Sequence, residues 1–254
     1  TKRVLDAVFD QGPPRFVVGD PRASVRLAPL LDAGVLRPWA DGVTGWPRMN
    51  AVGAALAEGL DVRLEAQVTR ATRSGAGWTL ECADGARFVA SHLVLTAPVP
   101  QSLAILEAGP YWLPPLVAEA LAHVQYEPCL ALLVTSSVAS RVPEDGLRPQ
   151  TGPVRLVVDN VRKGISPGPG AALTVHLDPA ASARHYDRSA GEVFEVVRHV
   201  VAPLLDGEPG GVAMHRWRYS QAVARHADAC VWLADDALGL AGEDRKSTRL
   251  NSSH

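Results

Sequence analysis

The fold is decided by residues 61–96, which read DVRLEAQVTRATRSGAGWTLECADGARFVASHLVLT. Apolar and polar residues alternate here with the period of two that is typical of half-buried strands. The turn sequences Ser74–Gly77 and Asp84–Gly85 separate three such runs. The stretch therefore predicts a strand that feeds a small antiparallel meander. The alternating apolar residues are Val62, Leu64, Ala66 and Val68 in the first run and Trp78, Leu80 and Cys82 in the second.

The end of this stretch has a different pattern. His92–Thr96 is almost continuously apolar, which is typical of a strand that is buried on both faces. The segment Ala97–Pro100 follows directly and contains two prolines. Because proline cannot donate to the ladder of a central strand, we expect this strand to end at Thr96.

Two helices are predicted before the meander. The pair Asp20-Pro21 is a start signal, since Asp can cap a helix and Pro suits its first position. Apolar residues then recur at helical spacing as far as Gly34. A second helix is predicted over Met49–Glu58, with Gly59 placed to end it.

Helices and strands alternate after Pro100, and the whole pattern predicts a mixed α/β protein. The predicted helices are Gln101–Glu107, Leu116–His123 and Glu192–Leu205. The predicted strands are Cys129–Thr135, Val154–Val158, Leu173–Leu177, Val212–Tyr219, Val231–Leu233 and Leu238–Leu240.

The composition is that of an ordinary globular protein. Of 254 residues, 47% are apolar and 20% are charged, and the formal net charge of −2 provides no basic field for nucleic acid or an anionic membrane. A local cluster of Arg216, Arg218 and Arg225 alternates with aromatic residues, which indicates a solvated strand edge. With no signal-peptide pattern and no apolar run long enough to span a bilayer, we expect a cytoplasmic protein without a membrane partner. The chain has no initiator Met, and we expect a piece upstream to be absent from it.

Cysteine and histidine do not suggest a metal site. Cys82, Cys129 and Cys230 are widely spaced among apolar neighbours, and we interpret them as buried structural thiols. Four histidines lack the spacing that a helix-borne metal site requires, and we expect them at the surface. These histidines are His185, His199, His215 and His226.

A serine hydrolase motif is present in form only. Residues 164–168 read GISPG and fit GxSxG, but Pro167 follows the serine. The oxyanion hole of such an enzyme uses the backbone N–H of that residue, which proline lacks. We therefore reject a nucleophile elbow at Ser166.

The C-terminal segment begins as a strand and turn and then changes character. Residues 238–243 read LGLAGE, a short apolar strand that reaches a glycine turn with an acid behind it. Residues 244–254 read DRKSTRLNSSH and have no apolar periodicity, so we predict a non-native tail there. The chain contains no GxGxxG turn.

Several segments in this order resemble the renalase-like branch of the FAD-dependent amine oxidase superfamily. They are MNAVGAALAEGL from Met49, the meander DVRLEAQVTRATRSGAGWTLECADG, LVLTAPVP from Leu93, and HRWRYSQA from His215. The resemblance runs from Phe9 to Glu243. It implies an incomplete FAD/NAD(P)-binding Rossmann-like domain with a β-meander, joined to an α+β substrate domain with a mixed sheet. The implied FAD-binding parts are 1–12, 45–100 and 223–243, and the implied substrate-domain parts are 13–44 (helical) and 101–222.

The resemblance also implies positions for a cofactor. Val68 would meet the adenine end of FAD through its backbone, and Thr96, Ala97 and Pro98 would pass close to FAD at the strand end. Trp217 would lie near the isoalloxazine ring. The implied sugar and phosphate grip is Gly242 with Glu243, the implied flavin-facing loop contains Gly12, and the implied substrate-side residues are Tyr219 and Gln221. No catalytic residue is predicted, and no metal.

This chain departs from the pattern of the superfamily at three places. A small residue and Gln usually follow the glycine of the D-x-G segment, whereas Pro13 and Pro14 follow Gly12 here. Arg48 stands where Gly usually precedes Met49, and Glu243 replaces Asp. With the opening Rossmann turn and the last helix absent, we expect the chain itself to bind FAD poorly and to be inactive.

The activity implied for the parent protein is that of a flavin-dependent oxidoreductase. A small-molecule substrate, either an amine or a reduced nicotinamide, would deliver a hydride to FAD, and dioxygen would reoxidise the flavin. Two alternatives remain open. One alternative is a non-catalytic fragment that keeps the substrate-domain fold without flavin. The other is a member of another branch of the superfamily, desaturase-like or porphyrinogen oxidase-like.

Overall fold

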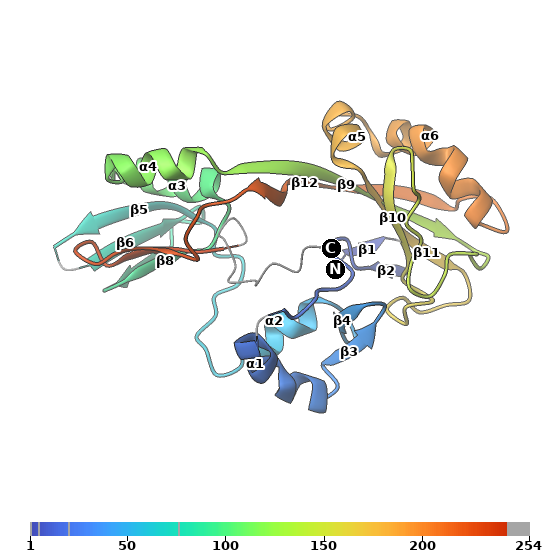
Figure 1. Ribbon diagram of the computed structural model, residues 1–254, viewed down its shortest axis with the longest axis horizontal. Helices are drawn as coiled ribbons and strands as arrows, with labels where there is room; N and C mark the ends of the chain where they lie inside the picture. The colour runs from blue at the N-terminus through green and yellow to red at the C-terminus, as the bar shows by residue number, and fades with distance from the viewer. Residues whose placement is uncertain (1, 5, 20, 76, 243–254) are drawn as a thin grey trace. The chain divides into compact units, whose positions relative to one another are not determined.

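In the computed structural model, which describes residues 2–4, 6–19, 21–75 and 77–242, the chain divides into two units (Figure 1). The first unit comprises Thr1–Leu60 and Pro128–Arg218, and the second comprises Asp61–Glu127 and Tyr219–His254. Two long strands, β9 (Gln125–Ser136) and β12 (Gly211–Ala224), belong partly to each unit. The units divide the chain at other positions than the predicted domains, and the assignment of domains to cofactor and substrate stays a prediction.

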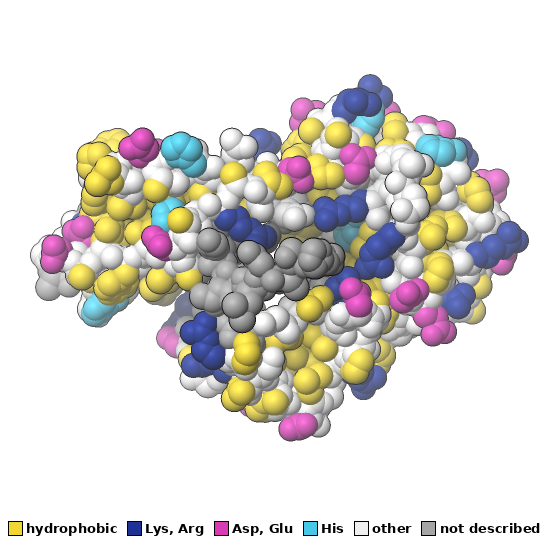
Figure 2. Space-filling model, in the orientation of Figure 1, with side chains coloured by type: hydrophobic (Ala, Val, Ile, Leu, Met, Phe, Trp, Pro, Cys, Tyr) yellow, Lys and Arg dark blue, Asp and Glu magenta, His cyan; other side chains and the backbone are white. Residues whose placement is uncertain are grey.

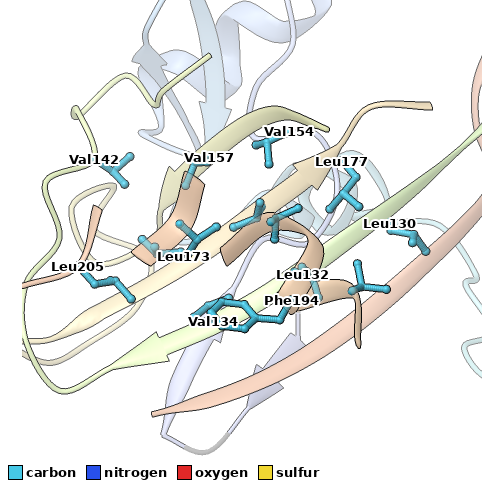
Figure 3. Packing of buried hydrophobic residues seen from close by; sticks show 14 of the residues in the cluster. Leu130, Leu132, Val134, Val142, Val154, Val157, Leu173, Leu177, Phe194 and Leu205 are labelled. Atoms are coloured by element: carbon cyan, nitrogen blue, oxygen red, sulfur yellow. The ribbon is translucent and has the colours of Figure 1, made fainter. Parts of the chain in front are cut away.

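The first unit is organised by a four-stranded sheet with the order β10-β11-β9-β12. Strands β10 (Val154–Asp159) and β11 (Ala171–Leu177) pair antiparallel, and β11 pairs antiparallel with β9. Alternation along β11 sends Leu173 and Val175 into one apolar core, together with residues of α5 (Pro179–Arg184) and α6 (Ala190–Val201) (Figure 3). The short helix η1 (Ala202–Leu204) follows α6. One face of the sheet therefore packs against helices.

The opposite face of this sheet carries the polar residues of β11. Thr174 and His176 alternate with the core residues, and both are buried. Phe9, which has no exposed surface, packs here with Leu133 and Ala172. Phe9 belongs to the hairpin of β1 (Lys2–Val4) and β2 (Ala7–Phe9). This face is the one on which the first unit assembles its polar contacts.

Residues 10–60 complete the first unit. Helix α1 (Pro21–Asp32) leads to the hairpin of β3 (Leu36–Trp39) and β4 (Gly42–Gly45), and helix α2 (Asn50–Leu56) follows. A side chain on Gly45 would lie 2.7 Å from the carbonyl oxygen of Arg48 and 2.8 Å from the Cα of Met49. Glycine at this position lets the hairpin lie directly against the start of α2.

The second unit contains the predicted meander. Strands β5 (Val68–Ser74), β6 (Gly77–Cys82) and β7 (Arg87–Ala90) form an antiparallel sheet, and Trp78 on β6 is completely buried. Helices α3 (Val99–Ala108) and α4 (Pro115–Ala122) contribute to the same core. Apolar side chains are also exposed around α4, where Leu116 is 81% exposed (Figure 2).

A second sheet of this unit has the order β13-β14-β8 and consists of three-residue strands. Strand β14 (Leu238–Leu240) pairs antiparallel with β13 (Val231–Leu233) and parallel with β8 (Leu93–Leu95). Leu93, Leu95, Leu238 and Leu240 face the core around Trp78. The parallel pair gives two chain segments that leave the sheet at the same edge.

The mixed α/β fold predicted from the sequence is confirmed, and the helices and strands after Pro100 form at their predicted places. One expectation about the run before the meander and one about the strand after it are wrong. Residues 62–67 form no strand, because β5 pairs only from Val68 onward, and Leu64 is 83% exposed. Strand β8 is buried on one face only, since Val94 is 57% exposed.

The expected exposure of several histidines and cysteines is also wrong. His185 and His226 are buried in the fold although both follow or precede polar residues in the sequence. Cys82 is buried as expected, but Cys129 is half-buried and Cys230, beside the β13 edge strand, is exposed. Apolar sequence neighbours do not determine burial when the residue lies in a connection or at a sheet edge.

Candidate functional site

Thr96 and Gly242 lie at the carboxyl ends of neighbouring parallel strands. Leu95 of β8 is the partner of Leu240 of β14, and the N–H of Ala241 donates to the carbonyl oxygen of Leu95 at 3.0 Å. Gly242 then has φ of +148°, a conformation that favours glycine. The carboxyl edge of parallel strands is where open α/β sheets bind ligands. The structure thus brings together two predicted cofactor residues; Glu243 lies outside the described residues.

The segment after Thr96 turns at once into a helix. Pro98 is the residue before the first turn of α3, and the N–H of Val99 donates to the hydroxyl of Tyr126 at 2.9 Å. The hydroxyl of Ser102 donates to the carbonyl oxygen of Ala97 at 2.9 Å. Ala97 and Pro98 are therefore held in place by α3, while the Thr96 side chain is exposed at the strand end.

Val68 begins β5 and pairs with Cys82 of β6. The register shifts between Val68 and Arg70, so a β-bulge places Thr69 outside the regular ladder. Bulges of this kind change the direction of a strand end, which suits a backbone contact with a ligand. The convergence of Val68 with Thr96 and Gly242 on one crevice stays a prediction.

In the first unit, Gly12 and Trp217 lie against each other. The indole Nε1–H of Trp217 donates to the carbonyl oxygen of Gln11 at 3.1 Å. A Cβ on Gly12 would lie 3.5 Å from the Trp217 ring. The ring of His215 meets that of Trp217 edge to face, with centroids 4.5 Å apart. Two segments about 200 residues apart, each predicted to face the flavin, are thus in direct contact.

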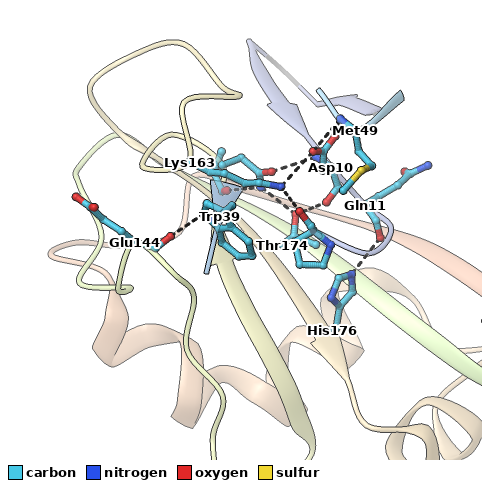
Figure 4. Close-up of polar contacts among 11 residues, drawn as sticks. Asp10, Gln11, Trp39, Met49, Glu144, Lys163, Thr174 and His176 are labelled. Atoms are coloured by element: carbon cyan, nitrogen blue, oxygen red, sulfur yellow. Dashed lines mark hydrogen bonds and ion pairs between the residues drawn. The ribbon is translucent and has the colours of Figure 1, made fainter. Parts of the chain in front are cut away.

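The turn that carries Gly12 is fixed by side chains from the sheet (Figure 4). The Gln11 carbonyl oxygen also accepts from Nε2 of His176 at 3.1 Å, so the neutral ring of His176 carries its proton on Nε2. Burial lowers the pKa of His176, which favours this neutral form. The hydroxyl of Thr174 donates to the carbonyl oxygen of Asp10 at 3.0 Å, and the Asp10 N–H donates to Asn160 at 3.1 Å.

A buried ion pair lies behind the same turn. Nζ of Lys163 donates to the carbonyl oxygen of Pro14 at 2.6 Å and lies 3.5 Å from Oδ2 of Asp10. The two side chains are only 1% and 2% exposed. The Asp10 carboxylate also accepts from the N–H of Met49 at 3.3 Å, where α2 begins. Burial lowers the pKa of Lys163, while the Asp10 carboxylate opposes that effect.

This network was not predicted from the sequence. Lys163, Asn160, Thr174 and His176 lie about 150 residues or more from their partners in the turn. One signal was available: Thr174 and His176 are polar residues spaced by two in an otherwise apolar strand. Polar residues on one face of a buried strand indicate hydrogen-bond partners from another segment.

The predicted substrate-side residues lie further along β12. Tyr219 and Gln221 follow Trp217 at intervals of two, so the three share a face of the strand. The ring of Tyr219 meets that of Tyr126 edge to face at 5.2 Å between centroids. Burial lowers the pKa of His215 on the same strand, and the charge of Lys2 lowers it further.

Two other predicted features have structural explanations. Ser166 of the GxSxG sequence is buried, and its hydroxyl accepts from the N–H of Val8 at 3.0 Å. It anchors the β1–β2 hairpin and is not presented as a nucleophile.

Within the described ranges, no three His, Cys, Asp or Glu side chains gather as a metal site would require, and no helix is both long and apolar enough to cross a bilayer.

Comparison with known proteins identifies the family. The flavin containing amine oxidoreductase family matches residues 14–231, which is most of the chain. The chain belongs to this family. The match covers the β3–β4 hairpin, the meander, the four-stranded sheet and Trp217.

Two solved structures share the fold. A protein described as a protoporphyrinogen oxidase from Exiguobacterium sp. 255-15 has a TM-score of 0.55 at 15% identity, over 81% of this chain and 48% of its own. A putrescine oxidase double mutant has a TM-score of 0.50 at 19% identity, over 68% of this chain and 39% of its own. The chain thus spans half or less of the length of these proteins.

The described residues fit the flavin that the family implies. The amide oxygen Oε1 of Gln11 is buried and has no hydrogen-bond partner among the residues that the structure describes. It belongs to the turn that contacts Trp217, where a polar edge of a bound ring would satisfy it. In the second unit, the exposed Thr96 and the left-handed Gly242 leave backbone accessible at the carboxyl edge of β8 and β14. Both parts are suited to hold a nucleotide cofactor.

Proposed function

We propose that the parent protein is a renalase-type oxidoreductase that uses FAD, and that its substrate is an amine or a reduced nicotinamide. The observation that supports this proposal most directly is the contact of Trp217 with Gln11 and Gly12. An indole anchored by its N–H keeps a fixed ring plane, which a catalytic pocket needs to orient a planar reactant. Membership of the flavin containing amine oxidoreductase family supports the class of reaction.

The proposed roles follow the resemblance residue by residue. Val68, Thr96–Pro98, Gly242 and Glu243 would hold the nucleotide part of FAD. Gly12 and Trp217 would border the flavin ring, and Tyr219 with Gln221 would line the substrate side. When bound, FAD supplies the two-electron acceptor, and dioxygen is the proposed final oxidant. These residues would position the reactants and exclude water. None of them is assigned a proton transfer.

Two other functions are tested by the same experiment. The structural likeness to a protoporphyrinogen oxidase favours, as second candidate, a branch that oxidises a porphyrinogen. A non-catalytic protein that keeps the fold is the third. We propose a cytoplasmic location for either enzyme.

The experiment is an oxygen-consumption assay of the purified full-length parent protein, supplemented with FAD. Separate reactions contain a panel of primary and secondary amines, reduced nicotinamide isomers, or a porphyrinogen. The proposal expects oxygen uptake with an amine or a reduced nicotinamide, and a large loss of it in Trp217→Ala but not in the exposed control Trp112→Ala. Uptake with the porphyrinogen alone would favour the second candidate. No uptake by a folded, FAD-loaded chain would favour the third.

A further inference from the structure

The Gln11 carboxamide is one of four first-unit side chains with a buried polar atom that has no hydrogen-bond partner among the described residues; the other atoms are Nε of Arg15, Oγ1 of Thr44 and Nδ1 of His185. In Gln11 this atom is the carboxamide oxygen Oε1. Buried polar groups in folded proteins are nearly always paired, because an unpaired one loses its hydration without compensation. The backbone carbonyl of the same residue, in contrast, accepts two hydrogen bonds.

The backbone around Gln11 cannot move to find a partner. Asp10 is held through its N–H by Asn160 and through its carbonyl by Thr174, and Nζ of Lys163 holds the carbonyl of Pro14. Gln11 itself is held by His176 and Trp217. Figure 4 shows the Gln11 side chain extending from this fixed turn, away from the Asp10–Lys163 pair. The Gln11 side chain therefore projects from a firmly held backbone, as in a preformed binding site.

The neighbour of this oxygen suggests the shape of the missing partner. Trp217 contacts the Gln11 turn and is half-buried, so part of its indole remains accessible. A large aromatic side chain offers a surface for a planar ring, and a carboxamide offers an acceptor beside a donor. A planar ring whose edge carries an N–H beside a C=O would satisfy both groups at once.

We propose that Gln11 is a specificity-determining residue that pairs with the amide edge of a planar ring lying against Trp217. This inference rests on the proposed function. The pyrimidine part of a flavin and the carboxamide of a reduced nicotinamide both present an N–H beside a C=O, so either ligand has the required chemistry. Because a buried acceptor discriminates strongly against a ligand that lacks the donor, methylation of the N–H should weaken binding.

The test measures binding by the quenching of tryptophan fluorescence and by calorimetry, with two matched pairs of probes. One pair is lumiflavin and its analogue methylated on the pyrimidine N–H. The other is 1-methyl-1,4-dihydronicotinamide, which has a free carboxamide, and the same compound with both amide hydrogens replaced by methyl groups. We expect the wild-type chain to prefer the N–H form of one pair by about tenfold. Gln11→Met, which keeps the length but neither donor nor acceptor, should lose this preference.

A second measurement separates ligand recognition from a structural role. If Oε1 is unpaired in the ligand-free chain, Gln11→Met should raise the melting temperature while it removes the preference. Gln101→Met, at an exposed site on α3, should change neither quantity. An unchanged preference in Gln11→Met would overturn the inference, as would a folded wild-type chain that binds the N–H and methylated probes equally or binds none of them. The oxygen-uptake assay decides the proposed function separately.

Discussion

Replacing Lys163 by Met tests the buried ion pair that Lys163 forms with Asp10. Methionine keeps the apolar stem but removes the ammonium that binds Pro14 at 2.6 Å and lies 3.5 Å from Asp10. The Asp10 carboxylate, only 2% exposed, then stays buried without its cation. A charge-assisted hydrogen bond contributes about 2 kcal/mol, and breaking a buried pair from one side costs more. We expect Lys163→Met to lose about 3 kcal/mol of unfolding free energy.

The assay is urea unfolding, followed by circular dichroism, with Arg141→Met as the control. Arg141 lies 2.6 Å from Asp206, closer than Lys163 to Asp10, but the two side chains are 69% and 46% exposed. Exposed pairs contribute little because water screens them, so the control should unfold close to the wild type. Equal effects of the two substitutions would refute the argument that burial, not distance, decides the contribution.

The pH dependence gives an independent check of the same pair. Burial lowers the pKa of Lys163 in the folded chain. Between that value and the unfolded pKa of about 10.4, the unfolded chain binds more protons, so stability should rise with pH. Lys163→Met should lose this contribution. The double variant with Asp10→Asn should lose less stability than the sum of the single variants, because it leaves no unpaired charge.

Three further substitutions test titration and packing, two in the second unit and Gly53→Ala in the first. Tyr111 donates to Asp236 at 2.6 Å, and its pKa is raised, mainly by burial and also by the Asp236 carboxylate. The unfolded chain therefore loses the Tyr111 proton first, and the fold should lose stability as pH rises above about 10. Tyr111→Phe should remove this pH dependence at a cost of about 1 kcal/mol, and thermal melts at several pH values measure both effects. A Cβ at Gly109 would lie 1.8 Å from the carbonyl oxygen of Ala71, so Gly109→Ala should displace α3 from β5 and lower the melting temperature sharply. A Cβ at Gly53 would have no atom within 4 Å, so Gly53→Ala should stabilise α2 by up to about 1 kcal/mol. Similar melting temperatures for the two alanine variants would contradict this account.

The regular elements could be predicted where a periodic pattern and a partner coincide. Helix α6 has a Ser189–Glu192 capping box and an apolar face, and β11 is a short apolar run bounded by turns. Residues 62–67 show that alternation alone is insufficient, since they join no ladder with any strand in the described part of the chain.

The candidate site could be predicted only in part. The pairing of Leu95 with Leu240 follows from two apolar strands whose turns were recognisable, which placed Thr96 and Gly242 at one edge. The contact of Trp217 with Gln11 and the pair of Asp10 with Lys163 could not be predicted, because they join segments that only the tertiary fold brings together.

The most direct measurement is the visible absorption spectrum of the purified full-length parent protein after incubation with FAD and gel filtration. The account predicts that flavin absorption elutes with the protein, and that Trp217→Ala weakens binding while Trp112→Ala does not. A folded full-length protein that elutes without flavin absorption would contradict the central claim that these residues form part of a flavin site.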